Sequence, residues 1–275
     1  MPNLFSIDRE KCKQDGICVS ACATRVIEMG PDGFPRSTED AAEFCINCGH
    51  CMSVCPQEAL SLKAMNLESG AAIDGALIPA RNQLEQWIRM RRSIRVFKED
   101  PVPREMLEKL IQAARYAPTG GNLQPVMWQV FENTADVRKI AGLVIDHWQE
   151  MVDGPAETTF PIERMQRWIR FWQQGYDPVF RHAPHLIINH GPREIPFADY
   201  ACIIAMTHID LLAPAFGLGA CWCGYLMASA DDYQPLVDEL NLPDGHKVFG
   251  AMFIGYSDLN YRRLPSRKEP TIFWR

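Results

Sequence analysis

Apolar residues recur at helical spacing in two stretches of the chain. Residues 105–117 predict an amphipathic helix because their apolar side chains share one face. That face carries Leu107, Leu110, Ile111 and Ala114. A shorter helix is predicted from Asn82, which as N-cap would be followed three residues later by Glu85. The apolar positions of this helix are Leu84, Trp87 and Ile88, with Arg91 on the same face.

A longer apolar run predicts a buried helix. Residues 200–216 read as a dense apolar helix that Pro214 kinks and Gly217 ends. Residues 211–230 contain no charged residue and are long enough to cross a bilayer. Because this stretch contains a proline and several glycines, and Asp210 precedes it, we expect a buried helix and a turn. No membrane segment is therefore predicted.

Runs of β-branched and aromatic residues predict strands at residues 126–131, 183–189 and 248–256. Residues 26–34 predict a hairpin, since a Pro-Asp-Gly turn interrupts the apolar positions. With 275 residues, the chain exceeds the usual size of a single domain, so two domains are expected.

The composition divides the chain near residue 64. Residues 1–63 are predicted to form a first domain that is too small to be stable on its apolar core alone. Residues 64–81 are small and mixed, which is typical of a linker. Within it, the apolar Ile73, Leu77 and Ile78 are expected to hold the linker against a surface. Residues 82–275 form the predicted second domain.

Charge and cysteine usage limit the possible functions. The net charge of −6 argues against nucleic-acid binding, and only the segment from Arg89 to Arg92 is locally basic. Seven of the ten cysteines fall in metal-ligand spacing rather than in a disulfide framework. No apolar leader opens the sequence. We therefore expect a cytoplasmic protein in a reducing cell.

Two related cysteine runs predict iron–sulfur chemistry. The first consists of Cys45, Cys48, Cys51 and Cys55, followed by Pro56. This spacing is that of bacterial four-iron cluster ligands. The upstream run consists of Cys12, Cys18 and Cys22, and Asp15 stands where a further cysteine would fall. A zinc knuckle or scattered structural thiols are the alternatives, but neither requires paired runs or a Cys-Pro ending.

On these motifs, residues 1–63 resemble the two-cluster bacterial ferredoxins. The resemblance implies that one cluster binds Cys22, Cys45, Cys48 and Cys51. The other would take Cys12, Cys18 and Cys55. It would be a four-iron cluster with Asp15 as an oxygen ligand, or a three-iron cluster in which the corner next to Asp15 is empty. The alternative for Asp15 is a solvated turn residue before Gly16.

The segment from Arg91 to Arg95 predicts a phosphate site, because arginine side chains match phosphate oxygens. Its polar members are Arg91, Arg92, Ser93 and Arg95. A second segment at 117–125 exposes backbone amides beside polar side chains. Its candidate binding residues are Pro118, Thr119, Gly120, Asn122 and Gln124.

In this order, the two segments resemble the FMN-dependent nitroreductase family, which implies an α+β domain over residues 83–275. The resemblance places Trp222, Cys223 and Gly224 along the flavin edge, where backbone amides rather than the Cys223 thiol would matter. It also places Arg267 at the FMN phosphate, and it implies an intertwined homodimer in which the partner's loop completes each site. Val126 replaces the family's usual tryptophan. No side chain receives a catalytic role, since the flavin N5 would carry the chemistry.

Residues 143–181 form an insertion rich in aromatic residues. Trp168 and Trp172 are one helical turn apart in it. By the resemblance, the insertion would cover the flavin and shape substrate access; packing in a dimer is the alternative. The remaining cysteines, Cys202, Cys221 and Cys223, are expected to be buried small residues.

Together these features predict an oxidoreductase. Electrons from a ferredoxin- or flavodoxin-type carrier would pass through the clusters to FMN and on to a small conjugated acceptor such as a nitroaromatic. An activated alkene, a quinone or a halogenated aromatic is an alternative acceptor. A non-enzymatic electron-transfer module is the alternative from another class.

Overall fold

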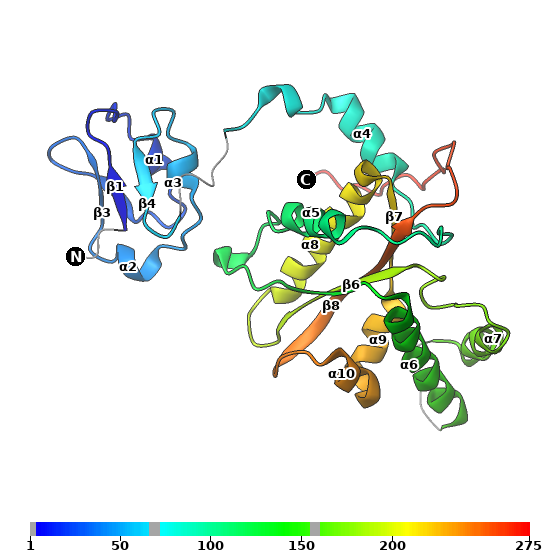
Figure 1. Ribbon diagram of the computed structural model, residues 1–275. Coiled ribbons are helices and arrows are strands. Elements are labelled where there is room, and N and C mark those ends of the chain that lie inside the picture. The colour runs from blue at the N-terminus through cyan, green and yellow to red at the C-terminus, as the bar shows by residue number, and fades with distance from the viewer. Residues whose placement is uncertain (1–3, 66–71, 155–159) are drawn as a thin grey trace. The chain divides into compact units, whose positions relative to one another are not determined.

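The computed structural model describes residues 4–65, 72–154 and 160–275 of the chain. It divides into two compact units (Figure 1). The first comprises Met1–Ile78 together with Gly121–Leu123, and the second comprises Pro79–Gly120 and Gln124–Arg275. The domain limits given above stay a prediction.

The first unit contains two small antiparallel sheets. Strand β1 (Phe5–Ile7) pairs with β4 (Leu60–Leu62), and β2 (Ile27–Met29) pairs with β3 (Pro35–Ser37). The predicted hairpin is confirmed: its turn is closed by a bond from Gly33 N to Gly30 O of 3.0 Å. The short helices are α1 (Ile17–Ala21), α2 (Ala41–Phe44) and α3 (His50–Ser53).

The segment before the second unit differs from expectation. Ile73, Leu77 and Ile78 are 88%, 80% and 64% exposed, so the prediction that they hold the linker against a surface is wrong. A 3-10 turn, η2 (Gly75–Leu77), precedes helix α4 (Arg81–Met90). Asn82 lies inside α4 and is not its N-cap. Ala80 occupies that position, and its amide donates to the Gln83 side chain at 2.9 Å.

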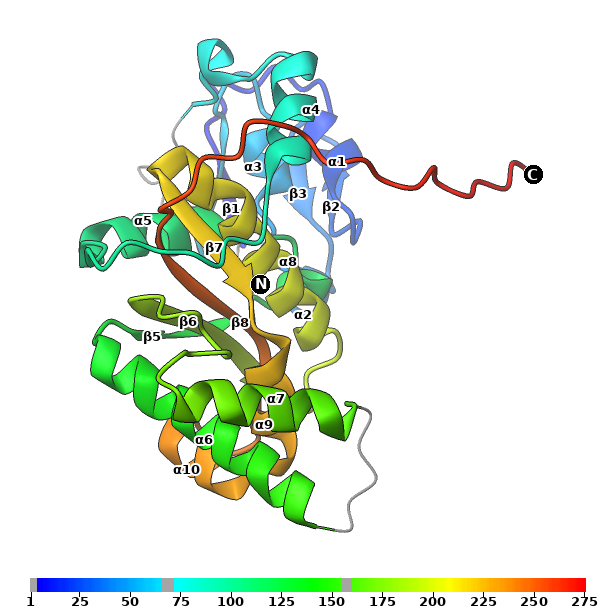
Figure 2. The ribbon, with the colours of Figure 1, turned by 90° about the vertical axis from the view of Figure 1, so that its right-hand side faces the viewer.

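The second unit is built on an antiparallel sheet in the order β5-β6-β8-β7. The strands are β5 (Met127–Phe131), β6 (His185–Pro192), β7 (Leu218–Trp222) and β8 (His246–Tyr256). Helices α5 (Arg104–Ala114) and α8 (Ala198–Leu212) cover one face. The opposite face is covered by α6 (Thr134–Asp153), α9 (Gly224–Asp232) and α10 (Gln234–Leu240), as Figure 2 shows.

Alternation along the central strands explains these layers. In β8, Ala251 and Phe253 enter the core beneath α6 and α9, whereas Met252 and Ile254 enter the core beneath α5 and α8. Successive strand residues point to opposite faces, so a strand buried on both sides reads as a continuous apolar run. The predicted α+β class is confirmed.

Helix α8 is the apolar helix expected from the sequence. It changes to a 3-10 turn, η4 (Ala213–Phe216), at Pro214, and Gly217 follows with a φ of 71°. By length and composition alone, Ala198–Phe216 is the one helix in the described part of the chain that could cross a membrane. A core helix of a soluble protein passes the same test, and Met206 and Ile209 are fully buried in the core of the second unit.

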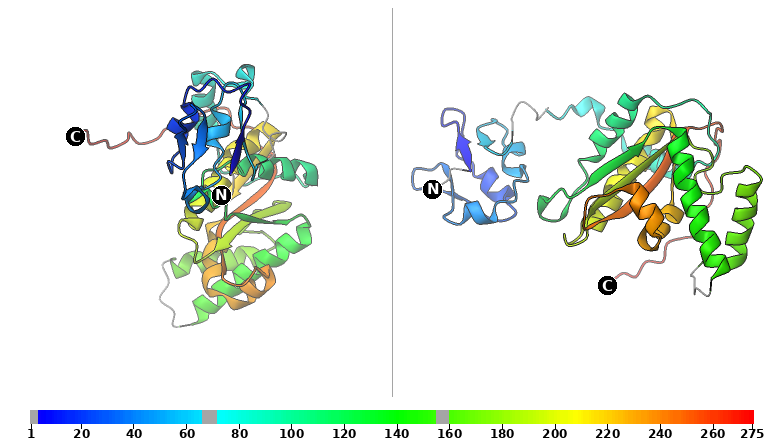
Figure 3. Two further views of the ribbon diagram at one scale, coloured as in Figure 1. Left: turned by 90° about the vertical axis from the view of Figure 1, so that its left-hand side faces the viewer. Right: turned by 60° about the horizontal axis from the view of Figure 1, so that its bottom comes forward.

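The aromatic insertion forms a helical layer on α6. Helix α7 (Ile162–Gln173) packs against α6 (Figure 3, right), and residues 155–159 between them lie outside the described parts. The Arg138 guanidinium carbon lies 4.7 Å from the centre of the Trp172 ring. The Arg181 guanidinium carbon lies 4.9 Å from the centre of the Trp168 ring. These two rings thus stack on arginines of their own chain. The roles considered above for the insertion stay hypotheses.

Candidate functional site

Four cysteines of the first unit line one cavity. They are Cys22, Cys45, Cys48 and Cys51, and Ile27, Ile46 and Leu62 are among the apolar residues around them. Burial raises the pKa of Cys51 to about 11, and the neighbouring Cys22 and Cys48 thiols contribute. The cavity thus gathers the four residues that the resemblance to ferredoxins assigns to one cluster, although the chain separates Cys22 from the others.

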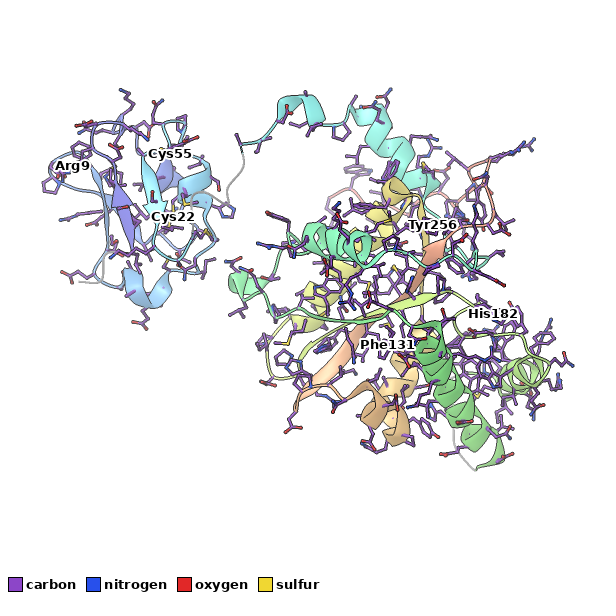
Figure 4. All side chains as sticks on the ribbon, viewed as in Figure 1. Arg9, Cys22, Cys55, Phe131, His182 and Tyr256 are labelled. Atoms are coloured by element: carbon purple, nitrogen blue, oxygen red, sulfur yellow. The ribbon has the colours of Figure 1, made fainter. Side chains whose placement is uncertain are left out.

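The remaining cysteines gather around Cys18. Burial raises the pKa of this thiol, and charge interactions with Cys12 and Cys55 act in the same direction. The amide of Ala59 donates to Cys55 Sγ at 3.3 Å, as amides do to cluster thiolates. Figure 4 labels Cys22 and Cys55, one member of each set.

The donor set fits iron–sulfur clusters better than a single metal ion. Thiolates suit such clusters, and the sulfurs surround a cavity. Among the described residues, no three His, Cys, Asp or Glu side chains converge as the ligands of one ion would. Burial acts to raise the pKa of Cys22, but hydrogen bonds from the Val26 amide and the Thr24 side chain lower it overall. These hydrogen bonds bring Cys22 closer to the thiolate form that ligation requires.

Asp15 occupies a turn. Its Oδ1 accepts from the amide of Ile17 at 3.2 Å, and the intervening Gly16 has a φ of 68°. This is the local bond with which aspartate stabilises a turn before a helix. The carboxylate is exposed in the first unit, and its role as an iron ligand stays a prediction.

The Asp15→Cys variant is expected to stabilise the cluster on Cys12, Cys18 and Cys55, because a thiolate binds cluster iron better than a carboxylate. After equal exposure to air, electron paramagnetic resonance should show a three-iron signal in the wild type and little in the variant. Asp8→Cys is the matched control, since Asp8 accepts from the Glu10 amide in a similar turn. Identical spectra from wild type and Asp15→Cys, without a three-iron signal, would leave Asp15 only a turn residue.

In the second unit, the arginine-rich segment meets β7. Ser93 forms a parallel bridge with Ala220, and the Ile94 amide donates to the Ala220 carbonyl at 3.0 Å. Burial raises the pKa of Cys221, while the charge of Arg95 and a hydrogen bond from Ser93 oppose it. Ser93 and Arg95 are thereby placed beside the start of the predicted flavin edge.

The adjoining arginines have different surroundings. Arg91 Nη1 is 3.2 Å from Asp210 Oδ2, so its charge is already paired. Arg92 Nη1 is buried without a hydrogen-bond partner among the described residues. A buried guanidinium nitrogen needs an acceptor. A phosphate group would supply one, and the segment therefore fits the anionic end of FMN.

The segment predicted to lie along the flavin edge, Trp222 to Gly224, directly follows Cys221 in the chain. The Cys223 amide donates to the Ala251 carbonyl at 2.8 Å, so the expectation that this amide serves the flavin is wrong. Gly224 opens helix α9, where the first amides have no acceptor inside the helix. A Cβ added at Gly224 would meet nothing within 4 Å. The free space and the first amides of α9 favour Gly224 over Cys223 as the backbone position that faces the flavin. Trp222 precedes them at the end of β7.

The loop at 118–124 is a tight turn that precedes β5 in the chain. Gly121, Asn122 and Gln124 all have positive φ values, and the Gln124 amide donates to Thr119 Oγ1 at 3.1 Å. A Cβ added to Gly191 of β6 would lie 3.1 Å from the carbonyl oxygen of Pro125. The loop therefore ends, at Pro125, near the end of β6 that lies away from His185.

Arg267 lies in the extended, exposed segment that follows β8 and projects from the second unit in Figure 2. Its Nη1 donates to the carbonyl of the adjacent Ser266 at 3.2 Å. The described contacts do not bring it to Arg91–Arg95, so its phosphate role stays a prediction.

We expect Arg92→Ala and Arg267→Ala each to weaken FMN binding by about 1.5–3 kcal/mol, because each would remove a charge-assisted hydrogen bond to phosphate. Quenching of flavin fluorescence on titration of the apoprotein measures this. Arg275→Ala is the matched control in the same terminal segment. If Arg267→Ala binds FMN as tightly as this control, Arg267 is misplaced in the site.

Sequence reasoning missed two charged residues near this region. Asp210 is 6% exposed inside apolar helix α8, and Arg181 contributes to the electrostatics of Cys221. An acidic residue within a dense apolar run was the available signal for Asp210. Arg181 had none. Two histidines of the second unit have structural partners: His185 Nε2 accepts from Val102 N at 2.7 Å, and His182 Nε2 accepts from Asp177 N at 3.1 Å.

The fold and these sites define a flavoprotein oxidoreductase with an iron–sulfur domain. Residues 88–256 match the nitroreductase family and residues 10–60 match the 4Fe-4S dicluster domain. The chain belongs to the nitroreductase family, and it carries a 4Fe-4S domain at its N-terminus.

The relatives differ in activity. A nitrobenzene nitroreductase of Ectopseudomonas oleovorans is 28% identical over 66% of this chain and 89% of its own. A 5,6-dimethylbenzimidazole synthase of Rhodospirillum rubrum is 26% identical over 69% of this chain and 88% of its own. A nitroreductase of Bacteroides fragilis with bound FMN has the same fold, with a TM-score of 0.57 and 22% identity over 70% of this chain and 99% of its own.

Proposed function

We propose that this protein is a cytoplasmic reductase that takes electrons from a ferredoxin- or flavodoxin-type carrier and delivers them to a small conjugated acceptor such as a nitroaromatic. Two iron–sulfur clusters in the first unit would receive the electrons, and FMN in the second would use them. The observation that carries the proposal is the grouping of the cysteines into two sets, in one chain with a nitroreductase fold.

The residues of the chain would bind and orient the cofactors. Arg92, Ser93 and Arg95 would hold the phosphate, and the first amides of α9 would face the flavin edge. Bound FMN would supply the electron transfer to the acceptor, as cofactors generally carry the redox chemistry. Cys223 is completely buried and burial raises its pKa to about 12, so its thiol is not a nucleophile here.

We further propose that the active form is a homodimer. Ser93 forms a bridge with Ala220, and Ala220 pairs with Ile254 of β8. Pro125 lies next to Gly191, and Gly191 pairs with Lys247 of β8. Seven residues of β8 separate these points, a span of about 23 Å. The arginine segment and the loop thus lie far apart within one chain, and a second copy would bring the partner's loop to each phosphate site.

The exposed face of α8 and the turn before it are suited to this interface. Phe197, Tyr200 and Ile203 are 64%, 61% and 42% exposed there. We expect Ile203→Arg to disrupt the dimer and to weaken FMN binding at least about tenfold, or about 1.4 kcal/mol. Ile162→Arg, at a residue 37% exposed at the start of α7, is the control. Sedimentation and FMN titration check both; an unchanged dimer with unchanged affinity in Ile203→Arg would contradict the proposal.

An anaerobic screen tests the function itself. Reduced ferredoxin and NADPH are compared as donors, and nitroaromatics, activated alkenes, quinones and halogenated aromatics as acceptors. We expect turnover with ferredoxin and a nitroaromatic. Turnover with only another acceptor would correct the substrate class, and reduction of a partner protein without turnover of any small acceptor would indicate an electron-transfer module.

A further inference from the structure

Asp210 is a buried carboxylate in the second unit that pairs with a residue of the predicted phosphate segment. It lies in the apolar helix α8, and its side chain is 8% exposed. Its Oδ2 is 3.2 Å from Arg91 Nη1, and the Arg91 side chain is 28% exposed. A buried carboxylate is strongly unfavourable unless it is paired, so this contact satisfies both groups.

A second group reaches Asp210 from β7. Burial raises the pKa of Asp210, while the charge of Arg91 and hydrogen bonds from the side chains of Trp222 and Arg91 oppose this effect. The indole N–H of tryptophan is a donor only, so the carboxylate accepts from it. Asp210 therefore joins residues that stand 131 positions apart in the sequence, Arg91 and Trp222.

These two residues belong to segments that already touch. A Cβ added at Gly219 of β7 would lie 2.6 Å from Ile94, so the strand and the arginine segment pack with no space between them. Helix α4 is also attached to α8 beside Asp210, because Trp87 Nε1 donates to the Leu211 carbonyl at 2.7 Å. Asp210 thus lies where α8 supports both segments.

We propose that Asp210 is a positioning residue of the FMN site, which fixes the phosphate-binding segment relative to the flavin-edge segment through Arg91 and Trp222. The inference rests on the proposed function, because it assumes that both segments bind one FMN. It also changes the expected role of Arg91. That guanidinium is held by Asp210 and orients the segment, while Arg92, Ser93 and Arg95 face the phosphate.

The test is FMN titration of full-length apoproteins by fluorescence, with Asp210→Asn as the main variant. We expect at least a tenfold loss of affinity, since the amide retains the size of the carboxylate but not the charge that holds Arg91. Asp210→Glu keeps the charge and should restore most of the affinity. Glu132→Gln is the matched control, because it breaks the ion pair with Arg104 on an exposed part of the same unit.

A double-mutant cycle separates positioning from general stability. If Asp210 acts through Arg91, then Arg91→Gln and Asp210→Asn should together cost little more affinity than either alone. Fully additive losses, or wild-type affinity in Asp210→Asn, would overturn the inference. If Asp210→Asn does not fold, the comparison of Asp210→Glu and Trp222→Phe with wild type decides, and unchanged affinity in both would overturn it. A wild-type protein that binds no FMN would instead refute the proposed function.

Discussion

A fragment of residues 79–275 should bind FMN but should lose reduction by ferredoxin, with a rate at least about a hundredfold below that of the full chain, or about 2.7 kcal/mol. The physical reason is that both cysteine sets lie in the first unit, so the fragment has no iron to receive single electrons. Anaerobic stopped-flow measurement of flavin bleaching with reduced ferredoxin gives the rate for each protein.

The control for this experiment is chemical reduction by dithionite, which does not require a docking site and should reduce both proteins similarly. A second control is the FMN content of the fragment, because the residues expected to bind the phosphate and the flavin edge lie in the second unit. If ferredoxin reduces the fragment as fast as the full chain, the clusters do not supply electrons to the flavin, and the proposed electron route is wrong.

The sequence was most informative where one residue type has one chemical use. The spacing of Cys45, Cys48 and Cys51 predicted a shared site, and the cavity contains all three together with Cys22. Continuous apolar runs likewise predicted β6, β8 and α8, because strands and helices buried on several sides leave few polar positions. These signals are local, and little in the rest of the chain can override them.

Predictions failed where tertiary partners decide between similar local choices. Asn82 is a good N-cap residue, but the N-cap of α4 is Ala80, two positions earlier, where the Gln83 side chain accepts from the Ala80 amide. The Cys223 amide was expected to be available, yet it donates to the Ala251 carbonyl, because the pairing of β7 with β8 continues one residue beyond Trp222. The Arg91–Asp210 pair joins residues from distant elements, and no spacing rule connects them.

Removal of iron should unfold the first unit and leave the second intact. The buried core of the first unit comprises Phe5, Cys18, Val26, Ile27, Ala41, Cys51, Leu60 and Leu62. Two of these are predicted ligands, so much of the interior exists to surround the clusters. A core in a unit this small rarely supplies more than about 3–5 kcal/mol, whereas the binding of a structural Zn²⁺ supplies about 10–16 kcal/mol to a zinc-finger peptide, which shows how large a contribution metal ligation can make.

Hydrogen exchange before and after treatment with an iron chelator and dithionite measures this effect. Amides of residues 4–65 should lose their protection, and those of β6 and β8 should keep it. Cys51→Ser should reproduce the loss without chelator, because it removes one ligand of the set that lines the cavity. Cys202→Ser is the matched control: this cysteine is also buried, but it lies in α8 of the second unit. Full protection of residues 4–65 in the iron-free protein would show that the apolar core alone maintains the fold, and the clusters would then serve electron transfer only.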